Sequence, residues 1–243
     1  MMCLRLCAIV SNTVTIGSLQ HMLPILFAFI FGTILIKYSK RNLSNSQQVN
    51  ILIGLGWFVS LFIISFHAYR MLFENYNFKT DLPLFLCSLL ALIIPIFTHY
   101  RKYWMFEILV FWIIGGTLQA VITPDIPEGL PSFDYFRYWI VHLGLLVIIF
   151  YVVFIFNMKP TLRSVLKSFL AFHVYLAIVA VLNYVLDANY FYLMEKPQSA
   201  TIMDHFGEWP YYVIAGQLVL IPLFLLVYLP FYLSSKFKKS FSK

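Results

Sequence analysis

Residues 138–156 read YWIVHLGLLVIIFYVVFIF, an apolar run that contains no Lys, Arg, Asp or Glu. A helix needs about 20 mostly apolar residues to cross the ~30 Å hydrocarbon core of a bilayer. In lipid, a spanning segment must satisfy its backbone hydrogen bonds internally, which a helix does. We therefore predict a transmembrane helix over residues 138–156.

Six other runs of the same kind occupy most of the remaining chain. They are residues 22–38, 50–73, 83–98, 104–122, 165–186 and 211–233. The first and third are near the short limit of about 17 residues. All are continuous, whereas barrel strands would alternate over segments of about ten residues. The predicted fold class is all-α, a multi-pass transmembrane bundle of seven spans. Residues 1–20 form a flexible or interfacial extension, 21–233 the membrane domain and 234–243 a basic cytoplasmic tail.

The composition supports this fold class. Hydrophobic residues make up 61% of the 243 residues and charged residues 11%. Soluble domains are about half apolar and a quarter charged, so a soluble globular protein is excluded. Disordered chains combine low hydrophobicity with high charge, and they are excluded too. Three cysteines are too few for a disulfide scaffold.

The charges alternate from loop to loop. Twelve of the 17 basic residues fall in loops and ends on one side of the predicted bundle, and nine of the ten acids fall on the other. The exception is Glu107, which lies on the basic side. Because Lys and Arg favour cytoplasmic loops, the N-terminus is predicted outside and the C-terminus in the cytoplasm. Attraction to anionic lipids accounts for the net charge of +7. We therefore expect membrane lipids, and no nucleic acid, as partners.

Polar side chains share one depth near the outer ends of the predicted spans. With a rise of ~1.5 Å per residue, five of them lie roughly 5–9 Å below the outer boundary; they are Cys87, Gln119, His142, Asn183 and Gln217. Polar groups in a membrane usually face the bundle interior, so we expect a polar pocket open to the outer side. Two alternatives stay open. The amides could join neighbouring helices, and helix ends are in any case more polar than helix middles.

Motifs that would assign a cofactor are absent from the sequence. It contains no phosphate loop, no dinucleotide-binding glycine pattern and no His-Glu-x-x-His. Cys3 and Cys7 lack histidines at zinc-ligand spacing. His21, His67 and His142 could meet as a metal cluster, but no local spacing supports one. We therefore expect no metal and no soluble cofactor, and the oligomeric state is left open.

Several motifs in order resemble a known family over residues 18–233. The stretches are SLQH at 18–21, DLPLFLC at 81–87, GTLQA at 116–120, TPD at 123–125, FRYW at 136–139, HLG at 142–144, NY at 189–190, EKP at 195–197 and GEWPYY at 207–212. Together they resemble the YwaF-like family of bacterial integral membrane proteins. That family is similar, more distantly, to an animal multispan protein that transfers acyl chains to lysophospholipids through a cysteine. The resemblance implies a multi-pass protein of the bacterial cell membrane.

The resemblance also implies roles for single residues. Cys87, in the Leu-Pro-Leu-x-x-Cys stretch, would be the nucleophile of a lipid acyltransferase or acyl hydrolase, and His142 its base. An imidazole close to a thiol raises the thiolate fraction, which makes this pair chemically reasonable. The substrate-binding candidates are His21, Gln119, Arg137, Asn183 and Lys196. The competing hypotheses are a small-solute transporter and a non-catalytic envelope partner protein.

Overall fold

The computed structural model describes residues 13–196 and 205–240, and in these residues all regular structure is helical. Each of the seven apolar runs corresponds to a helix or a helical series, although α3 begins at Leu86, three residues after the predicted start at residue 83, and α6 ends at Ile155. The elements are α1 Leu19–Asn42, α2 Asn45–Phe73, α3 Leu86–Tyr100, α4 Tyr103–Trp112, the π-helix η1 Ile113–Thr117, α5 Leu118–Ile122, α6 Phe133–Ile155, α7 Leu162–Leu186, the 3-10 helix η2 Tyr190–Tyr192 and α8 Tyr211–Ser240. The all-α multi-pass bundle is thereby confirmed.

Six helices or helical series in the described residues are long and apolar enough to cross a membrane, and α3 is shorter, with 15 residues. The short first run belongs to a helix of 24 residues, because α1 continues past the apolar stretch to Asn42. Lys40 and Arg41 lie in its last turn. Cations at a helix C-terminus interact favourably with the helix dipole, which explains the continuation. The seventh span, at α3, stays a prediction.

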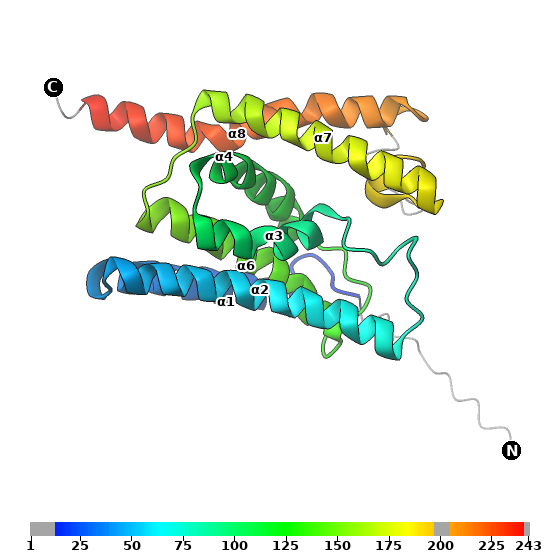
Figure 1. Cartoon of the computed structure of the whole chain (residues 1–243), viewed down its shortest axis with the longest axis horizontal. Helices are drawn as coiled ribbons and strands as arrows, with labels where there is room; N and C mark the ends of the chain where they lie inside the picture. The colour runs from blue at the N-terminus through cyan, green and yellow to red at the C-terminus, as the bar shows by residue number, and fades with distance from the viewer. Residues whose placement is uncertain (1–12, 197–204, 241–243) are drawn as a thin grey trace, which may run out of the picture.

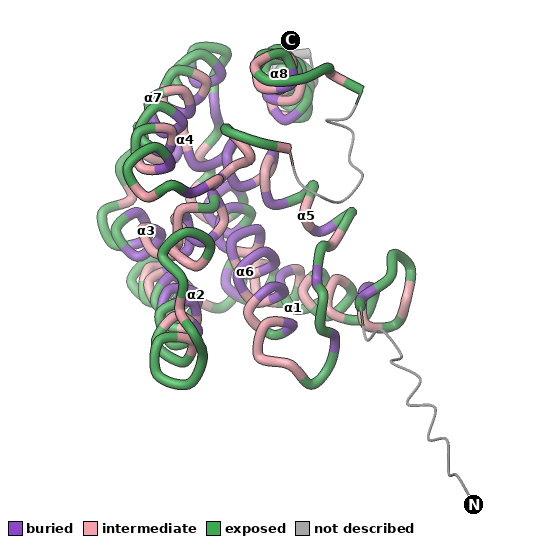
Figure 2. Tube along the Cα trace, turned by 90° about the vertical axis from the view of Figure 1, so that its right-hand side faces the viewer, coloured by how far each residue is buried: buried purple, intermediate pink, exposed green. Residues whose placement is uncertain are grey.

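The helices form three layers (Figure 1). α1 and α2 lie on one side, α3, α4 and α6 in the middle, and α7 and α8 on the other side. Figure 2 shows α6 surrounded by other helices, and most of its residues are buried or partly buried. α1, α2, α3 and η1 all pack against it. The apolar core is therefore built around α6, while much of α1 and α8 is exposed.

The fourth predicted span is interrupted by the π-helix η1. Its two glycines allow close packing: a Cβ on Gly116 would lie 2.9 Å from Leu86 of α3, and one on Gly115 would lie 3.5 Å from Phe224 of α8. A π-turn holds one more residue than an α-turn and often occurs at functional sites. It ends at Thr117, which is fully buried.

The connections between helices lie at two opposite ends of the bundle (Figure 1). The short connections 43–44, 101–102 and 156–161 and the end of α8 lie at the end called basic here, and segments 74–85, 123–132, 187–196 and 205–210 lie at the end called acidic. Which side of the membrane each end faces stays a prediction, as do the three domain boundaries. Glu107 is buried in the basic half, where Ser164 and Lys167 donate hydrogen bonds to it at 2.7 and 2.6 Å.

Candidate functional site

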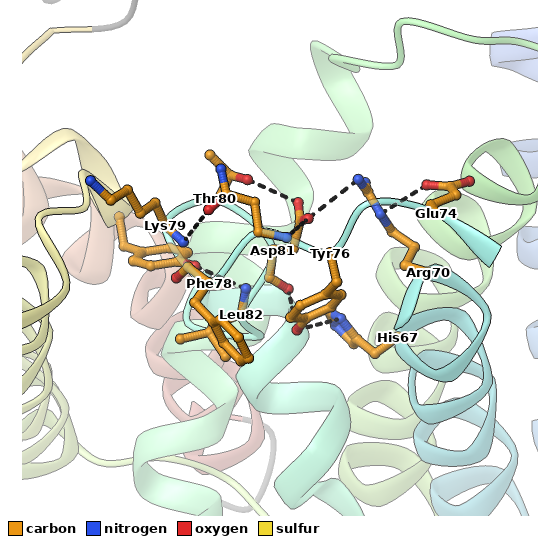
Figure 3. A network of polar contacts seen from close by, with 11 residues as sticks. His67, Arg70, Glu74, Tyr76, Phe78, Lys79, Thr80, Asp81 and Leu82 are labelled. Carbon is orange, nitrogen blue, oxygen red and sulfur yellow. Dashed lines mark hydrogen bonds and ion pairs between the residues drawn. The ribbon is translucent and has the colours of Figure 1, made fainter. Parts of the chain in front are cut away.

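The loop before α3 positions Cys87, and Asp81 organises the first part of that loop (Figure 3). The Asp81 carboxylate accepts hydrogen bonds from the Asn77 N–H at 2.8 Å, the Thr80 hydroxyl at 3.0 Å and Arg70 at 3.4 Å. The Tyr76 hydroxyl donates to the Asp81 carbonyl at 2.9 Å. Burial, together with the nearby Asp81 carboxylate, raises the pKa of Tyr76, so this hydroxyl keeps its proton. The loop is thus fastened to the end of α2.

The second part of the loop is held from the side of α7. Asn183 donates from Nδ2 to the Tyr190 carbonyl at 2.9 Å and accepts from the Tyr190 N–H at 2.8 Å. The Tyr190 hydroxyl then donates to the Phe78 carbonyl at 2.8 Å and accepts from the Leu82 N–H at 2.9 Å. The hydroxyl of Tyr175 donates to the Leu84 carbonyl. Asn183 therefore fixes the position of Tyr190, and Tyr190 in turn holds the loop that leads into α3.

Cys87 is the second residue of α3, in the first turn of the helix. Its Sγ lies 4.0 Å from the Thr117 hydroxyl, at the end of the π-helix. A helix N-terminus favours negative charge, so this position stabilises a thiolate. Burial acts in the opposite direction, because it disfavours the charged form of a thiol. The thiol therefore has the positive end of a helix and one hydroxyl beside it, in a buried setting.

His142 lies on α6 and is buried, with 5% of its surface exposed. Its Nδ1 is 2.6 Å from the Tyr138 carbonyl, and the two rings are 4.1 Å apart. A carbonyl only accepts, so Nδ1 carries the proton and Nε2 the free lone pair. Among the described residues, neither Cys87 nor any other group is hydrogen-bonded to His142 Nε2. An imidazole in this state is able to accept a proton.

Arg137 lies on α6, the helix that also contains His142. Asp134 pairs with it at 2.7 Å from Nε and 2.5 Å from a terminal nitrogen, and the guanidinium lies 4.7 Å from the centre of the Phe66 ring. Arg137 and His142 lie on the same helix, five residues apart. Asp134, also on α6, is therefore the ion-pair partner that holds the guanidinium in place.

The other predicted site residues have separate partners. His21 accepts from the Gly17 N–H and donates to the Val121 carbonyl, both at 2.9 Å. Gln119 is exposed on α5. Lys196 donates to Glu208 at 3.1 Å. The structure thus assigns His21, Asn183 and Lys196 to other contacts, and in the described residues it shows no hydrogen bond that joins Cys87, His142 and Arg137. Their roles in substrate binding stay predictions.

Two further side-chain atoms are buried without a hydrogen-bond partner in the described residues. They are Nε2 of His67 and Oε1 of Gln217. No group of three or more His, Cys, Asp or Glu side chains in this part of the chain is arranged to hold a metal ion. Cys3 and Cys7 lie outside the described residues.

Sequence reasoning missed Thr117, Tyr175 and Tyr190. Thr117 stands in the Gly-Gly-Thr stretch, where the paired glycines are a signal of close packing. No sequence pattern places the two tyrosines at a site, because tyrosines are common in interfacial belts. Their hydroxyl bonds to backbone carbonyls depend on the path of the loop, which no local pattern indicates.

One comparison with known proteins identifies a family. The model of the TMEM164 family matches residues 16–228, a stretch that includes all seven predicted site residues. No curated protein and no solved structure matches the chain.

Proposed function

Because the chain belongs to the TMEM164 family, a multispan membrane family, we propose that it is a membrane enzyme that transfers acyl chains between lipids through Cys87. The observation that carries the proposal is the setting of Cys87. The thiol lies in the first turn of α3, beside Thr117. The positive end of a helix favours the thiolate, which is the reactive form of a nucleophilic cysteine.

The proposed reaction has two steps and needs no further reactant. In the first, His142 takes the proton of the Cys87 thiol and the thiolate attacks the ester carbonyl of a donor lipid; a thioester forms, the ester C–O bond breaks, and the leaving alkoxide takes that proton back from His142. In the second, the hydroxyl of a lysolipid attacks the thioester and returns a proton to His142, which regenerates the thiolate. Dividing one acyl transfer between two steps is the usual role of a covalent nucleophile.

His142 supports the proposal through its tautomer. The Tyr138 carbonyl holds Nδ1, which leaves Nε2 as the proton acceptor. A base must come within about 3 Å of its partner or act through one water, with looser geometry in the absence of substrate. α3 and α6 pack against each other, so a water or a small side-chain movement would complete this path.

Arg137 is the proposed donor to the oxyanion or to the lipid phosphate. Asp134 occupies one edge of its guanidinium, and further N–H groups remain for a ligand. Lys196 is the second candidate for the phosphate, and Gln119, His21 and Asn183 complete the proposed set. Since His21 and Asn183 are fully bonded to backbone groups, they would act by positioning the chain around the substrate.

The test uses the full chain with Cys3 and Cys7 replaced by Ser, so that Cys87 is the one thiol. The purified protein is mixed with phosphatidylcholine that carries a radiolabelled acyl chain, with and without lysophosphatidylcholine. We expect a hydroxylamine-sensitive label on Cys87 that is chased into product lipid by the lysolipid. Cys87→Ala and Cys87→Ser should abolish the label and leave the helical circular dichroism spectrum unchanged.

Two results would contradict the proposal. One is acyl transfer that persists in Cys87→Ala. The other is a thiol that reacts with a lipid-like maleimide in folded protein but never forms a thioester with any of a panel of phospholipid donors. The maleimide control shows that Cys87 is accessible, so the second result counts against acyl transfer rather than against exposure.

A further inference from the structure

An apolar groove lies between α1, α2 and α6 and has a volume of about 770 Å³. Its walls include Phe27 and Phe31 of α1, Leu55 of α2, and Trp139 and Val147 of α6. None of Cys87, Thr117 and His142 lines it. The groove is therefore separate from the site described above, although both use α6.

The outer part of the groove depends on Pro24, the sixth residue of α1. Proline has no N–H, so the carbonyl of Gln20, four residues earlier, loses its helical donor. The Tyr135 hydroxyl of α6 donates to that carbonyl at 2.7 Å. The Gln20 side chain accepts from the Leu130 N–H at 2.9 Å, which ties α1 to the loop before α6. These bonds hold the end of the groove nearest the acidic end of the bundle.

The groove stops near the middle of the bundle. A Cβ on Gly32 would lie 3.4 Å from Val147, so α1 and α6 approach closely at that level. From Leu19 to Phe31 the groove follows α1 for thirteen residues, or roughly 18 Å. That length is little more than half of the ~30 Å hydrocarbon core. A transmembrane helix of another protein would need the full thickness, whereas one lipid acyl chain occupies one leaflet.

One polar group of the groove wall has no partner. Trp139 is 4% exposed, and its indole N–H is buried without an acceptor in the described residues. Trp139 is one turn below Phe136, so it lies in the part of the groove nearest the acidic end. A buried donor without an acceptor is costly, and a ligand carbonyl would satisfy it once the indole turns its N–H toward the groove. A phospholipid whose acyl chain lay in the groove, with its headgroup toward the acidic end, would bring an ester carbonyl to this part of the groove.

We propose that this groove is a binding site for one acyl chain of a glycerophospholipid, with the ester carbonyl accepting a hydrogen bond from Trp139. The lipid is a resident ligand of the bundle that fills the space between α1 and α6. The site is independent of the chemistry at Cys87.

The test uses the full chain in nanodiscs with phosphatidylcholine that carries a diazirine midway along one acyl chain. After photolysis, peptide mass spectrometry locates the label. We expect the label to concentrate on residues 23–31 and 139–147 and to saturate at one lipid per chain. Ala28→Phe, which fills the groove, should reduce this label at least fivefold. Val174→Phe, on an exposed position of α7, is the matched control and should have no effect.

Trp139→Phe tests the hydrogen bond, because it keeps the aromatic ring and removes the N–H. We expect about two- to tenfold weaker competition by unlabelled phosphatidylcholine, the cost of one neutral hydrogen bond. If Ala28→Phe fails to fold, Ala28→Leu supplies a smaller filling side chain.

Three outcomes would overturn the proposal. Label spread evenly over α1, α7 and α8, and unaffected by Ala28→Phe, would indicate ordinary boundary lipid. Crosslinks between two chains at the groove, without lipid label, would indicate a second copy as the occupant. Loss of the label in Cys87→Ala would show that the groove belongs to the acyl-transfer site. Failure of acyl transfer alone would leave the groove label intact, so the two proposals are tested separately.

Discussion

The first turn of α1 and the third turn of α6 each contain a buried histidine, and the two histidines have different hydrogen-bond partners. His21 and His142 are 4% and 5% exposed. Both ring nitrogens of His21 are bonded to backbone groups, whereas His142 has a partner at Nδ1 alone among the described residues. A proton acceptor needs a free lone pair. Equal depth and equal burial therefore do not imply equal function; the number of occupied ring nitrogens separates a structural histidine from a candidate base.

The largest expected effect is on the rate of thioester formation, where the two histidines should differ most. His142→Ala should slow thioester formation at Cys87 about 10²–10⁴-fold, the usual contribution of a general base. His21→Ala should leave the rate per folded molecule within about twofold. The initial rate of acyl labelling, normalised to folded protein, measures both. Equal slowing in the two variants would refute the distinction.

The second prediction extends the comparison to Asn183, another residue of the predicted polar layer. Asn183→Ala leaves the buried N–H and carbonyl of Tyr190 without partners. We expect a loss of about 3 kcal/mol in unfolding free energy, since each unsatisfied group costs about 1–3 kcal/mol. Thermal unfolding in detergent measures it, with the exposed Val181→Ala as control. An unchanged midpoint would mean that water replaces the amide.

The third prediction concerns the stability that His21 provides. His21→Ala removes the bond to Val121 and its stacking on Trp139, whose ring centre is 5.7 Å away. A loss of about 2 kcal/mol is expected, from one carbonyl left without a donor. The same unfolding assay applied to His142→Ala should show a smaller loss, because the Tyr138 carbonyl keeps its helical environment. A larger loss in His142→Ala would reverse the assignment.

The fourth prediction tests whether the Thr117 hydroxyl affects the reactivity of Cys87. Thr117→Val removes the hydroxyl nearest to Sγ and keeps the side-chain shape. The rate of thiol labelling should fall about two- to tenfold, the worth of one hydrogen bond. Thr117→Ser should restore most of it. A Val variant that labels at the normal rate would assign Thr117 a packing role.

The smallest expected effect is at the surface, where Lys79 donates to Asp187 at 2.5 Å. This hydrogen bond lowers the pKa of Asp187 below its ordinary value of 3.8. A lowered folded-state pKa stabilises the fold above the unfolded-state pKa, and the benefit is lost as the pH falls through the folded-state pKa. The midpoint difference between wild type and Asp187→Asn should therefore be small at neutral pH, shrink once the pH falls below about 3.8, and vanish below the still lower folded-state pKa. A difference that grows on acidification would contradict this sign.

Hydropathy predicted the helices well, because a segment that crosses lipid must be continuously apolar and must satisfy its backbone hydrogen bonds internally. It misplaced the end of α1, where the polar residues up to Asn42 continue the helix. It also missed the π-helix, because that break depends on how Gly115 and Gly116 pack against α8 and α3. Apolar runs indicate which segments are helical, and contacts between helices decide their internal irregularities.

The depth of the candidate site residues stays a prediction, and their direction was not predictable. α3 begins at Leu86 and α6 at Phe133, so Cys87 is the second residue of its helix and His142 the tenth. The helical rise says nothing of rotation about the axis. The carbonyl that bonds His21 belongs to Val121, one hundred residues away, and Gln119 turned out to be exposed. Such partners follow from the path of the loops, and no spacing in the sequence encodes them.

The π-helix at residues 113–117 has a consequence for the gene as well as for the protein. Its extra residue corresponds to one codon. Deleting that codon would rewind the segment as an α-helix and rotate everything beyond it by about 100°. Thr117 would then turn away from Cys87, although the length and hydropathy of the span would hardly change. Two homologous genes that differ by this single codon would encode the same bundle with different chemistry beside the thiol.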